Sequence, residues 1–324
     1  MSDTPEQRRP AGALERDWLA VWLPSHHHSP LPLSEAAMAR AFDGLAAMGF
    51  NAVFSAVWNR GLTAWPSEVM ARQGLPRQDP ALAAAAIDPL ATMVRLGRER
   101  GRQVVAWFEY GFAAEPAGEP GPLLAIHPHW QARDRRGQGV VHGGLRWLNG
   151  REPAVRTLLR ELMREVVAHY GVDGVQGDDR IAIPLPGRGD AASISAWVRE
   201  TGAAIRSLQP GCRWLMAPAP PPVGLRQLGP DGPAWLRDGS VDLLLPQLYR
   251  ASLADYRRAL QQCLAELPAA CRPRLVPGLA LRPHGRQVGA AMVAEVRRLN
   301  RAEGLGGLAL FHHGQLQGGQ LASP

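Results

Sequence analysis

The chain alternates short apolar segments with segments of helical pattern, and this alternation limits its fold more than any other feature. Each apolar segment is bounded by glycine, proline or polar residues, which is typical of a buried parallel strand. The predicted strands are Leu19–Leu23, Ala52–Trp58, Gln103–Glu109, Val172–Asp178, Trp214–Pro218, Val241–Leu248, Arg274–Leu281 and Gly307–His312. Eight such strands in one chain predict the α/β class and favour a single closed (β/α)₈ barrel (a TIM barrel) over an open doubly wound sheet. The open sheet loses further support because no GxGxxG follows the first strand and no P-loop occurs.

Helical patterns fill most of the intervals between these strands. Ser34 is a suitable N-cap for the first helix, and Gly101 and Gly171 are suitable stops for two others. The predicted helices are Ser34–Met48, Pro89–Arg100, Pro153–Tyr170, Ala191–Leu208, Leu253–Leu267 and Arg286–Glu303, with a weak pattern rich in helix breakers at Val223–Gly239.

A chain of 324 residues suits one large domain of this kind. We expect residues 1–15, which are polar and charged, to be a disordered lead-in, and residues 16–324 to form the barrel. Two long loops stand out, Gly61–Ala86 after the second strand and Phe112–Asn149 after the third. Both follow strand ends, where barrels carry their function, so we expect these extended loops to help build the site.

The overall charge excludes little by itself. The net charge is +7 and the pI about 10.2, but the chain contains no lysine, and its 36 arginines are scattered rather than gathered in a stripe. We therefore expect no nucleic-acid partner.

Three cysteines without a CxxC pair argue against a disulfide framework. The N-terminal residues lack an apolar signal region, and no apolar run is long enough to span a membrane, so we expect a cytoplasmic protein without a membrane partner. The oligomeric state stays open.

Three carboxylates at predicted strand ends are the candidate catalytic groups. Glu109 ends the third strand, and Asp178 and Asp179 end the fourth. Cleavage of a glycosidic bond needs one carboxylic acid to protonate the leaving oxygen and a second group to supply or steer a nucleophile. The alternative is a purely structural role, in which the aspartates form a turn and a helix cap. A lone buried glutamate is costly unless it is paired, which favours a site role for Glu109.

Further polar and aromatic residues at the strand ends are candidates for binding a sugar. Asparagine, glutamine and tyrosine suit hydroxyl groups, while an indole suits the apolar C–H face of a sugar ring. For Trp58, Trp107 and Tyr249 a place in the core is an equally good interpretation. The candidate substrate-binding residues are Trp58, Asn59, Arg60, Trp107, Tyr110, Arg180, Gln247, Tyr249, His27 and His28.

The histidine run after the first strand also suggests a metal site. Metal-dependent hydrolases on this barrel need further histidines after later strands and an aspartate after the eighth. Here the fifth and sixth strands end without histidine, and the eighth ends in His312-His313. We therefore expect no metal and no cofactor. A metal-dependent hydrolase that uses His26, His28 and the aspartates remains the weaker alternative.

Several motifs taken together resemble the bacterial glycosyl-hydrolase-like family 10. They span most of the chain in the expected order: VWL (21–23), GFNAVFSAVWNRG (49–61), AWPS (64–67), VVAWFEYGF (104–112), HPHW (127–130), WLNG (147–150), VDGVQGDDR (172–180), AWVRE (196–200) and VDLLLPQLYR (241–250). The resemblance implies a TIM barrel that acts on polysaccharide, with some relatives linked to bacterial cell-wall glycan. It aligns Asp178-Asp179 with the family's strand-four motif and Glu109 with its strand-three motif.

The chain departs from this family at a few positions. Relatives commonly have a bulky apolar residue in place of Gly177 and proline in place of Gly150, and many of them are exported. The strand-four motif also resembles that of chitinase-type barrels, which would suit an N-acetylated glycan, but Gln176 and Arg180 stand where acids are expected. The seventh strand ends in Leu281-Arg282, so the common retaining arrangement with a nucleophile there is not supported.

Two main hypotheses follow. The first is a glycoside hydrolase that cleaves a polysaccharide or oligosaccharide by carboxylate acid/base catalysis, with an N-acetylated or cell-wall glycan as one candidate substrate. The second is a non-catalytic barrel that binds a glycan without cleaving it, since a fold does not guarantee its chemistry.

Overall fold

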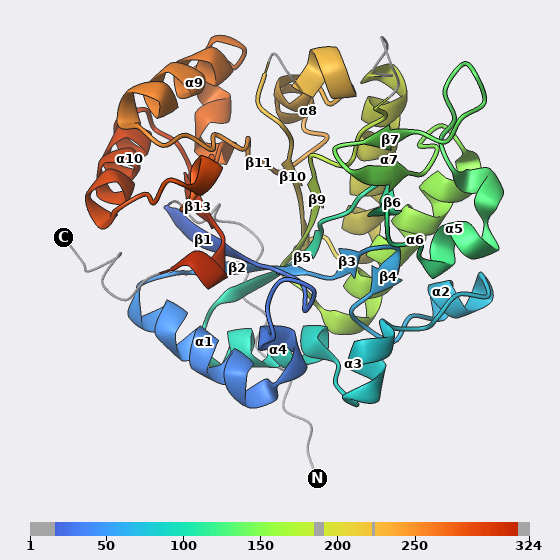
Figure 1. The fold of residues 1–324 in the computed structure, drawn as a ribbon. Coiled ribbons are helices and arrows are strands. Elements are labelled where there is room, and N and C mark those ends of the chain that lie inside the picture. The colour runs from blue at the N-terminus through green and yellow to red at the C-terminus, as the bar shows by residue number, and fades with distance from the viewer. Residues whose placement is uncertain (1–16, 185–190, 222–223, 317–324) are drawn as a thin grey trace.

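The computed structural model describes residues 17–184, 191–221 and 224–316 of the chain. The predicted lead-in, residues 1–15, lies outside the described residues. In Figure 1 the strands form a central ring that is surrounded by helices.

The central sheet contains eight parallel strands, and their spatial order is β11-β10-β9-β5-β2-β1-β13-β12. Their bounds are β1 Trp18–Leu23, β2 Ala52–Ala56, β5 Gln103–Phe108, β9 Gly174–Asp178, β10 Arg213–Ala217, β11 Leu243–Leu244, β12 Gly278–Ala280 and β13 Gly307–Phe311. Two parallel bridges, Leu244–Leu275 and Gln247–Gly278, join the β11 side to the β12 side. Each predicted strand has a counterpart in this sheet, and the α/β class is confirmed.

The sixth and seventh strands are much shorter than the sequence predicts. Regular pairing is confined to β11 and β12, whereas the apolar segments extend over 241–248 and 274–281. Pro246 and Pro277 lie in these segments, and a proline has no N–H to donate to the next strand. The junction between β11 and β12 therefore rests on isolated bridges and a few hydrogen bonds, such as the 2.9 Å bond from the Val276 N–H to the Leu244 carbonyl.

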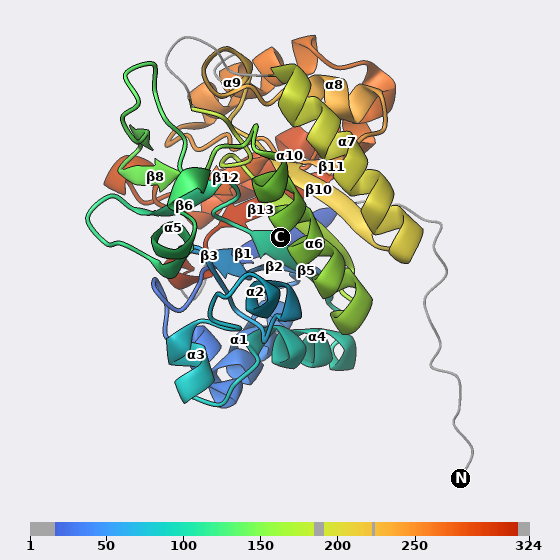
Figure 2. The ribbon, with the colours of Figure 1, turned by 90° about the vertical axis from the view of Figure 1, so that its right-hand side faces the viewer.

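A helix follows each strand from β1 to β12 and covers the outside of the ring. These helices are α1 Glu35–Ala47, α4 Pro89–Glu99, α6 Pro153–Tyr170, α7 Ala191–Leu208, α8 Gly232–Arg237, α9 Leu253–Ala265 and α10 Ala290–Ala302. The Ser34 side chain accepts a hydrogen bond from the Ala37 N–H at the start of α1, and Gly171 ends α6 in the left-handed conformation. Figure 2 shows α6 and α7 packed side by side. No described helix is both long enough and apolar enough to cross a membrane.

The core has two layers because side chains alternate across each strand. One cluster fills the inside of the barrel and includes Trp18, Trp22, Phe54 and Trp107. The other lies between the strands and the helices. One polar residue is built into the inner layer: Gln176, fully buried, accepts a 2.7 Å hydrogen bond from the Trp22 indole N–H.

The two long loops contain short elements. The first holds β4 (Leu62–Thr63), which pairs with β3 (Trp58–Asn59), together with α2 (Glu68–Arg72) and α3 (Pro80–Ala84). The second holds a small antiparallel sheet of β6 (Ala113–Pro116), β8 (Leu145–Trp147) and β7 (Val141–His142), as well as α5 (Pro122–Ile126). Glu165 on α6 ties the first loop to the barrel, because its carboxylate accepts hydrogen bonds from the Trp65 indole (3.0 Å) and the Glu68 N–H (2.8 Å).

Two glycine substitutions should change stability in opposite directions. Gly307 begins β13 with φ +146°, and a Cβ there would lie 2.1 Å from the Trp18 carbonyl oxygen. Gly307→Ala should therefore lower the free energy of unfolding by roughly 3 kcal/mol. Gly44 is exposed on α1 with open space around it, so Gly44→Ala should raise the same quantity by about 0.5–1 kcal/mol. Urea denaturation measures both, and equal effects of the two changes would contradict this packing of β13 on β1.

Candidate functional site

The ends of β5 and β9 bring the three candidate carboxylates together. These strands are neighbours, with Trp107 paired to Gln176 and Phe108 paired to Gly177, so the residues that follow them meet at one mouth of the barrel. Arg180 lies between the two strand ends. Its guanidinium donates a 3.0 Å hydrogen bond to the Glu109 carbonyl and lies 3.9 Å from the Glu109 carboxylate.

Asp178 is the most tightly held of the three acids. It is 4% exposed, and its carboxylate accepts hydrogen bonds from the Trp107 indole (3.0 Å), the Gln247 amide (2.6 Å) and the Asp179 N–H (2.8 Å). The Gln247 amide also donates to the Ala217 carbonyl at 2.9 Å, which fixes its orientation. All these groups donate, so Asp178 is placed as an acceptor.

The two aspartates keep a proton to a higher pH than an isolated aspartate would. Burial raises the pKa of Asp178 well above its ordinary range, and the charge of Asp179 raises it further. Burial also raises the pKa of Asp179, while Arg180 opposes this shift.

Glu109 is buried and paired. Its carboxylate accepts a 2.7 Å hydrogen bond from the Asn59 amide, and Arg180 supplies a nearby positive charge. Burial raises the pKa of Glu109, although Arg180 and Asn59 act against that shift. The cost of burying this carboxylate is therefore partly offset, as the sequence argument required.

The two tryptophans proposed as sugar platforms lie inside the protein. Trp58 is fully buried, and its indole N–H donates to the Gly111 carbonyl at 3.0 Å. Trp107 is 2% exposed, packs edge-on against Trp22 within the barrel and holds Asp178. The structure therefore gives both rings the packing role that the sequence left open, and neither ring presents a free face for stacking.

The other candidate binding residues lie around the same mouth. The Arg180 guanidinium sits 5.2 Å from the centre of the buried Tyr110 ring. Tyr249 is partly exposed and stacks on Phe311 with ring centres 5.3 Å apart, and burial raises its pKa. His28 is exposed, and its charge acts on Glu109. Arg60, by contrast, pairs with Glu119 in the second long loop.

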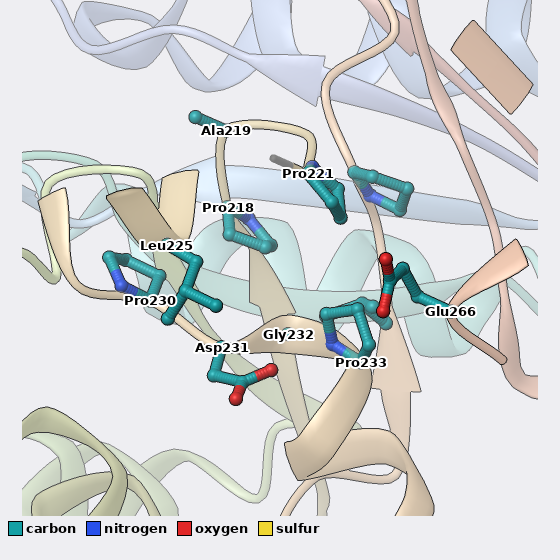
Figure 3. Close-up of a pocket in the computed structure, with 11 residues that line it drawn as sticks. Pro218, Ala219, Pro221, Leu225, Pro230, Asp231, Gly232, Pro233 and Glu266 are labelled. Atoms are coloured by element: carbon teal, nitrogen blue, oxygen red, sulfur yellow. The ribbon is translucent and has the colours of Figure 1, made fainter. Parts of the chain in front are cut away.

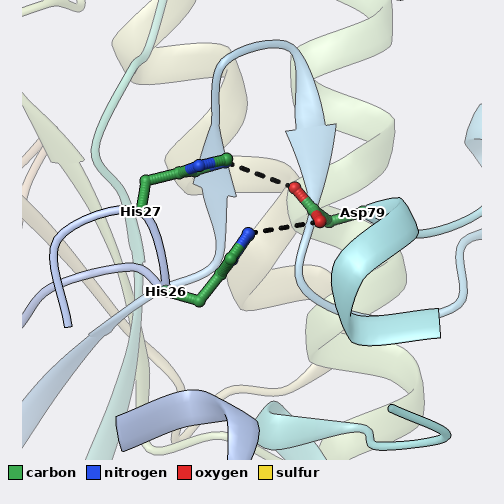
Figure 4. Close-up of side chains that lie close together, drawn as sticks. All are labelled: His26, His27 and Asp79. Carbon is green, nitrogen blue, oxygen red and sulfur yellow. Dashed lines mark ion pairs between the residues drawn. The ribbon is translucent and has the colours of Figure 1, made fainter. Parts of the chain in front are cut away.

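The histidine run forms a different group from the one expected for a metal-dependent hydrolase. The structure brings His26 and His27 to Asp79, with each Nε2 atom 3.3 Å from one Asp79 oxygen (Figure 4). Burial lowers the pKa of His26, although Asp79 acts to raise it. Burial would raise the pKa of Asp79, but the contacts with the two histidines and the hydrogen bond from the Ala81 N–H together outweigh it and leave that pKa below its ordinary value.

Sequence reasoning missed Asp79 and Gln176. Asp79 precedes Pro80 and caps α3 by accepting from the Ala81 N–H, so its sequence context indicates a helix start rather than a site. The position of Gln176, two residues before Asp178, was a usable signal because residues i and i+2 of a strand share a face.

A cavity lies between the ends of β10 and β11 and helix α8. It measures about 150 Å³ and is lined mainly by proline and apolar side chains (Figure 3). Pro218 and Pro246 follow the two strands, and Asp231 and Glu266 are the acidic residues of its lining. None of the three candidate carboxylates belongs to this cavity.

Little space is left for a side chain at Gly177 and Gly150, the two positions where the sequence departs from the family pattern. A Cβ at Gly177 would lie 2.6 Å from the Met216 sulfur and 2.9 Å from Ile181. A Cβ at Gly150 would lie 3.0 Å from Ile183 and 3.3 Å from Phe112. Neighbouring side chains therefore fill the space beside both glycines.

The fold and this site define a class: α/β proteins with the fold of TIM-barrel glycoside hydrolases. An α-amylase from Lactobacillus plantarum superimposes with a TM-score of 0.59 at 14% identity, covering 93% of this chain and 72% of that one. The PgaB (BpsB) glycoside hydrolase domain from Bordetella bronchiseptica gives a TM-score of 0.61 at 13% identity, covering 91% and 93%. At these identities the likeness shows the fold alone.

The particular family follows from the sequence. The family described as Glycosyl hydrolase-like 10 matches residues 18–190, more than half of the chain, and the chain belongs to this family. Glycosyl hydrolase DigH from Escherichia coli (strain K12) is 26% identical over 81% of this chain and 72% of its own length. The resemblance drawn from the motifs is confirmed.

Removing the Glu109 charge should stabilise the protein at neutral pH. An acid whose pKa is raised on folding loses stability as pH increases from its unfolded pKa, about 4.3 for glutamate, through its folded pKa. Glu109→Gln keeps an oxygen for Asn59 and removes the buried charge. Its Tm should exceed that of the wild type at pH 7, and the gap should shrink toward pH 4. A gap that widens at low pH would show that Glu109 is instead stabilised as a carboxylate.

Proposed function

We propose that this protein is a glycoside hydrolase whose active site is the carboxylate group at the ends of β5 and β9. The observation that carries the proposal is the Asp178–Asp179–Glu109 arrangement: three acids held at the mouth of a barrel that belongs to a glycosyl-hydrolase-like family. A purely structural role rarely explains several acids gathered at one largely buried site, because burying their charges is costly.

The hydrogen bonds support different roles for the two aspartates. Each oxygen of Asp178 already accepts from a donor, which favours the ionised form of this side chain, although burial and the charge of Asp179 raise its pKa. Asp179 is more exposed than Asp178 and is therefore better placed to give its proton to a substrate. We assign Asp179 as the general acid that protonates the glycosidic oxygen, and Asp178 as the carboxylate that stabilises the oxocarbenium-like transition state.

Glu109 is the third carboxylate, and it activates water or binds a sugar hydroxyl. Arg180, Asn59 and Gln247 position the acids, and Tyr249 and His28 lie where a sugar would reach them. We propose an N-acetylated or cell-wall glycan as the substrate, which rests on the family resemblance of the strand-four motif.

One observation favours the second candidate function, a barrel that binds a glycan without cleaving it. Asp178 and Glu109 are only 4% and 7% exposed, and Trp58 and Trp107 are enclosed. Substrate must therefore displace side chains at the mouth before it reaches these acids. An assay that measures binding and cleavage separately distinguishes the two functions.

Substituting the proposed acid should remove cleavage. Asp179→Asn should lower kcat by roughly 100- to 10,000-fold, the usual contribution of a general acid. The measurement is the release of reducing ends from a panel of bacterial and plant glycans that includes peptide-free cell-wall strands. Asp43→Asn, an exposed aspartate on α1, is the matched control and should keep wild-type activity. Equal activity of Asp179→Asn and Asp43→Asn would refute the assignment, and binding without release by the wild type would establish the second function.

The indole that holds Asp178 should affect the pH profile. Trp107→Phe removes a donor that favours the ionised form, so the pKa of the aspartate pair should rise. Because the general acid must be protonated, activity should persist to higher pH while kcat falls about tenfold. Trp214→Phe is the control, since its indole bonds only to the Val198 carbonyl in the outer core. An unchanged profile for Trp107→Phe would remove Trp107 from the acid system.

A further inference from the structure

A small pocket near the candidate carboxylates contains two histidines and an aspartate that have no role in the proposed glycan cleavage. It lies between the loop after β1, the β3–β4 hairpin and the start of α3. Its volume is about 10 Å³, enough for one ion or one water. His26, His27 and Asp79 line it together with Ser25 and Asn59.

The lining atoms resemble a ligand set. His26, His27 and Asp79 each offer one ligand atom, and these three atoms lie within 4.8 Å of one another (Figure 4). Each histidine nitrogen lies 3.3 Å from an Asp79 oxygen. Ligand atoms at about 2.0–2.1 Å from a tetrahedral zinc ion are separated by about 3.3 Å, so the two histidine–aspartate distances match the spacing that a shared ion requires.

Polar atoms left without partners point to a missing cation. Among the described residues that line the pocket, Ser25 Oγ and Asn59 Oδ1 are buried and form no hydrogen bond. Ser25 and Asn59 are only 6% and 5% exposed. Buried polar atoms rarely remain unpaired. A water has two protons to offer, whereas a cation can be shared by all of these lone pairs and the carboxylate.

The orientation of Asn59 fits this arrangement. Its amide nitrogen donates to Glu109, so its oxygen occupies the other end of the amide. Arg60, on the same hairpin, also acts on His26 electrostatically. Its guanidinium is paired with Glu119.

We propose that His26, His27 and Asp79 bind a divalent transition-metal ion, with Asn59 Oδ1 or Ser25 Oγ completing the coordination. Two imidazoles, a carboxylate and a neutral oxygen suit zinc better than calcium or magnesium, which prefer oxygen ligands alone. The ion would fasten the loop after β1 to the first long loop and would hold Asn59 against Glu109. It is a positioning site, and the proposal does not depend on glycan cleavage.

The test is zinc binding by protein purified without a histidine tag. The chain is stripped with a chelator, dialysed against Zn²⁺ and analysed for bound metal by mass spectrometry. Wild type should retain one zinc per chain and gain Tm with Zn²⁺. Asp79→Asn, which still caps α3, and His27→Gln should bind at least tenfold more weakly. His169→Gln, an exposed histidine on α6, should bind like wild type.

Cobalt supplies an independent readout, because its visible spectrum reports tetrahedral coordination by nitrogen and oxygen. Wild type and His169→Gln should show this spectrum, and His27→Gln should not. Circular dichroism identifies any variant that has failed to fold, and the wild-type spectrum and stoichiometry then decide alone. Absence of retained zinc in the wild type, or equal binding by folded Asp79→Asn, would overturn the proposal. Neither result would bear on the glycan assay.

Discussion

The gathering of three acids at the mouth of the barrel, two of them buried, is the constraint on which the surrounding contacts depend. The two buried acids receive donors from different parts of the chain: Asp178 from Trp107 on β5 and from Gln247 after β11, and Glu109 from Asn59 on β3. Arg180 adds the positive charge between them. These contacts require the ring of strands to hold its register, because a shift of one residue in β9 would turn Asp178 out of the barrel.

Residues of the inner layer of the barrel contact the candidate acids and continue their polar contacts along β9. Gln176 lies two residues before Asp178, and its amide oxygen accepts from the Trp22 indole, so adjacent inward positions of β9 are both polar and both accept a hydrogen bond from an indole. Buried polar networks of this kind are stable only when every member has a partner. The apolar rings of Trp22, Phe54 and Trp107 surround it and exclude water.

Much of the fold could be predicted because it depends on local patterns. The bounds of α6 were predicted to the residue, because proline marks its start and glycine its end. The end of α7 at Leu208 was predicted as well, whereas the residues just before Ala191 lie outside the described residues. The lengths of β11 and β12 were not predicted, because whether an apolar segment pairs regularly depends on where Pro246 and Pro277 meet a neighbour. For the site, the strand ends placed Glu109, Asp178 and Asp179 near one another.

What escaped prediction depends on tertiary contacts. The sequence could not show that Trp58 and Trp107 turn inward, nor that Asp79 approaches His26 and His27 from a loop more than fifty residues further along the chain. The sequence context of Asp79 predicts a helix cap, and Asp79 does cap α3. That context gives no sign of its contacts with the two histidines.

The measurement that tests the central claim most directly is hydrolysis of peptide-free cell-wall glycan strands in water enriched in ¹⁸O, followed by mass spectrometry of the products. If the barrel cleaves glycosidic bonds by acid catalysis with water, each new reducing end should carry one ¹⁸O atom, and Asp179→Asn should yield no labelled fragments. Intact, unlabelled strands that still bind to the wild-type protein would contradict that account and identify a barrel that recognises a glycan without cleaving it.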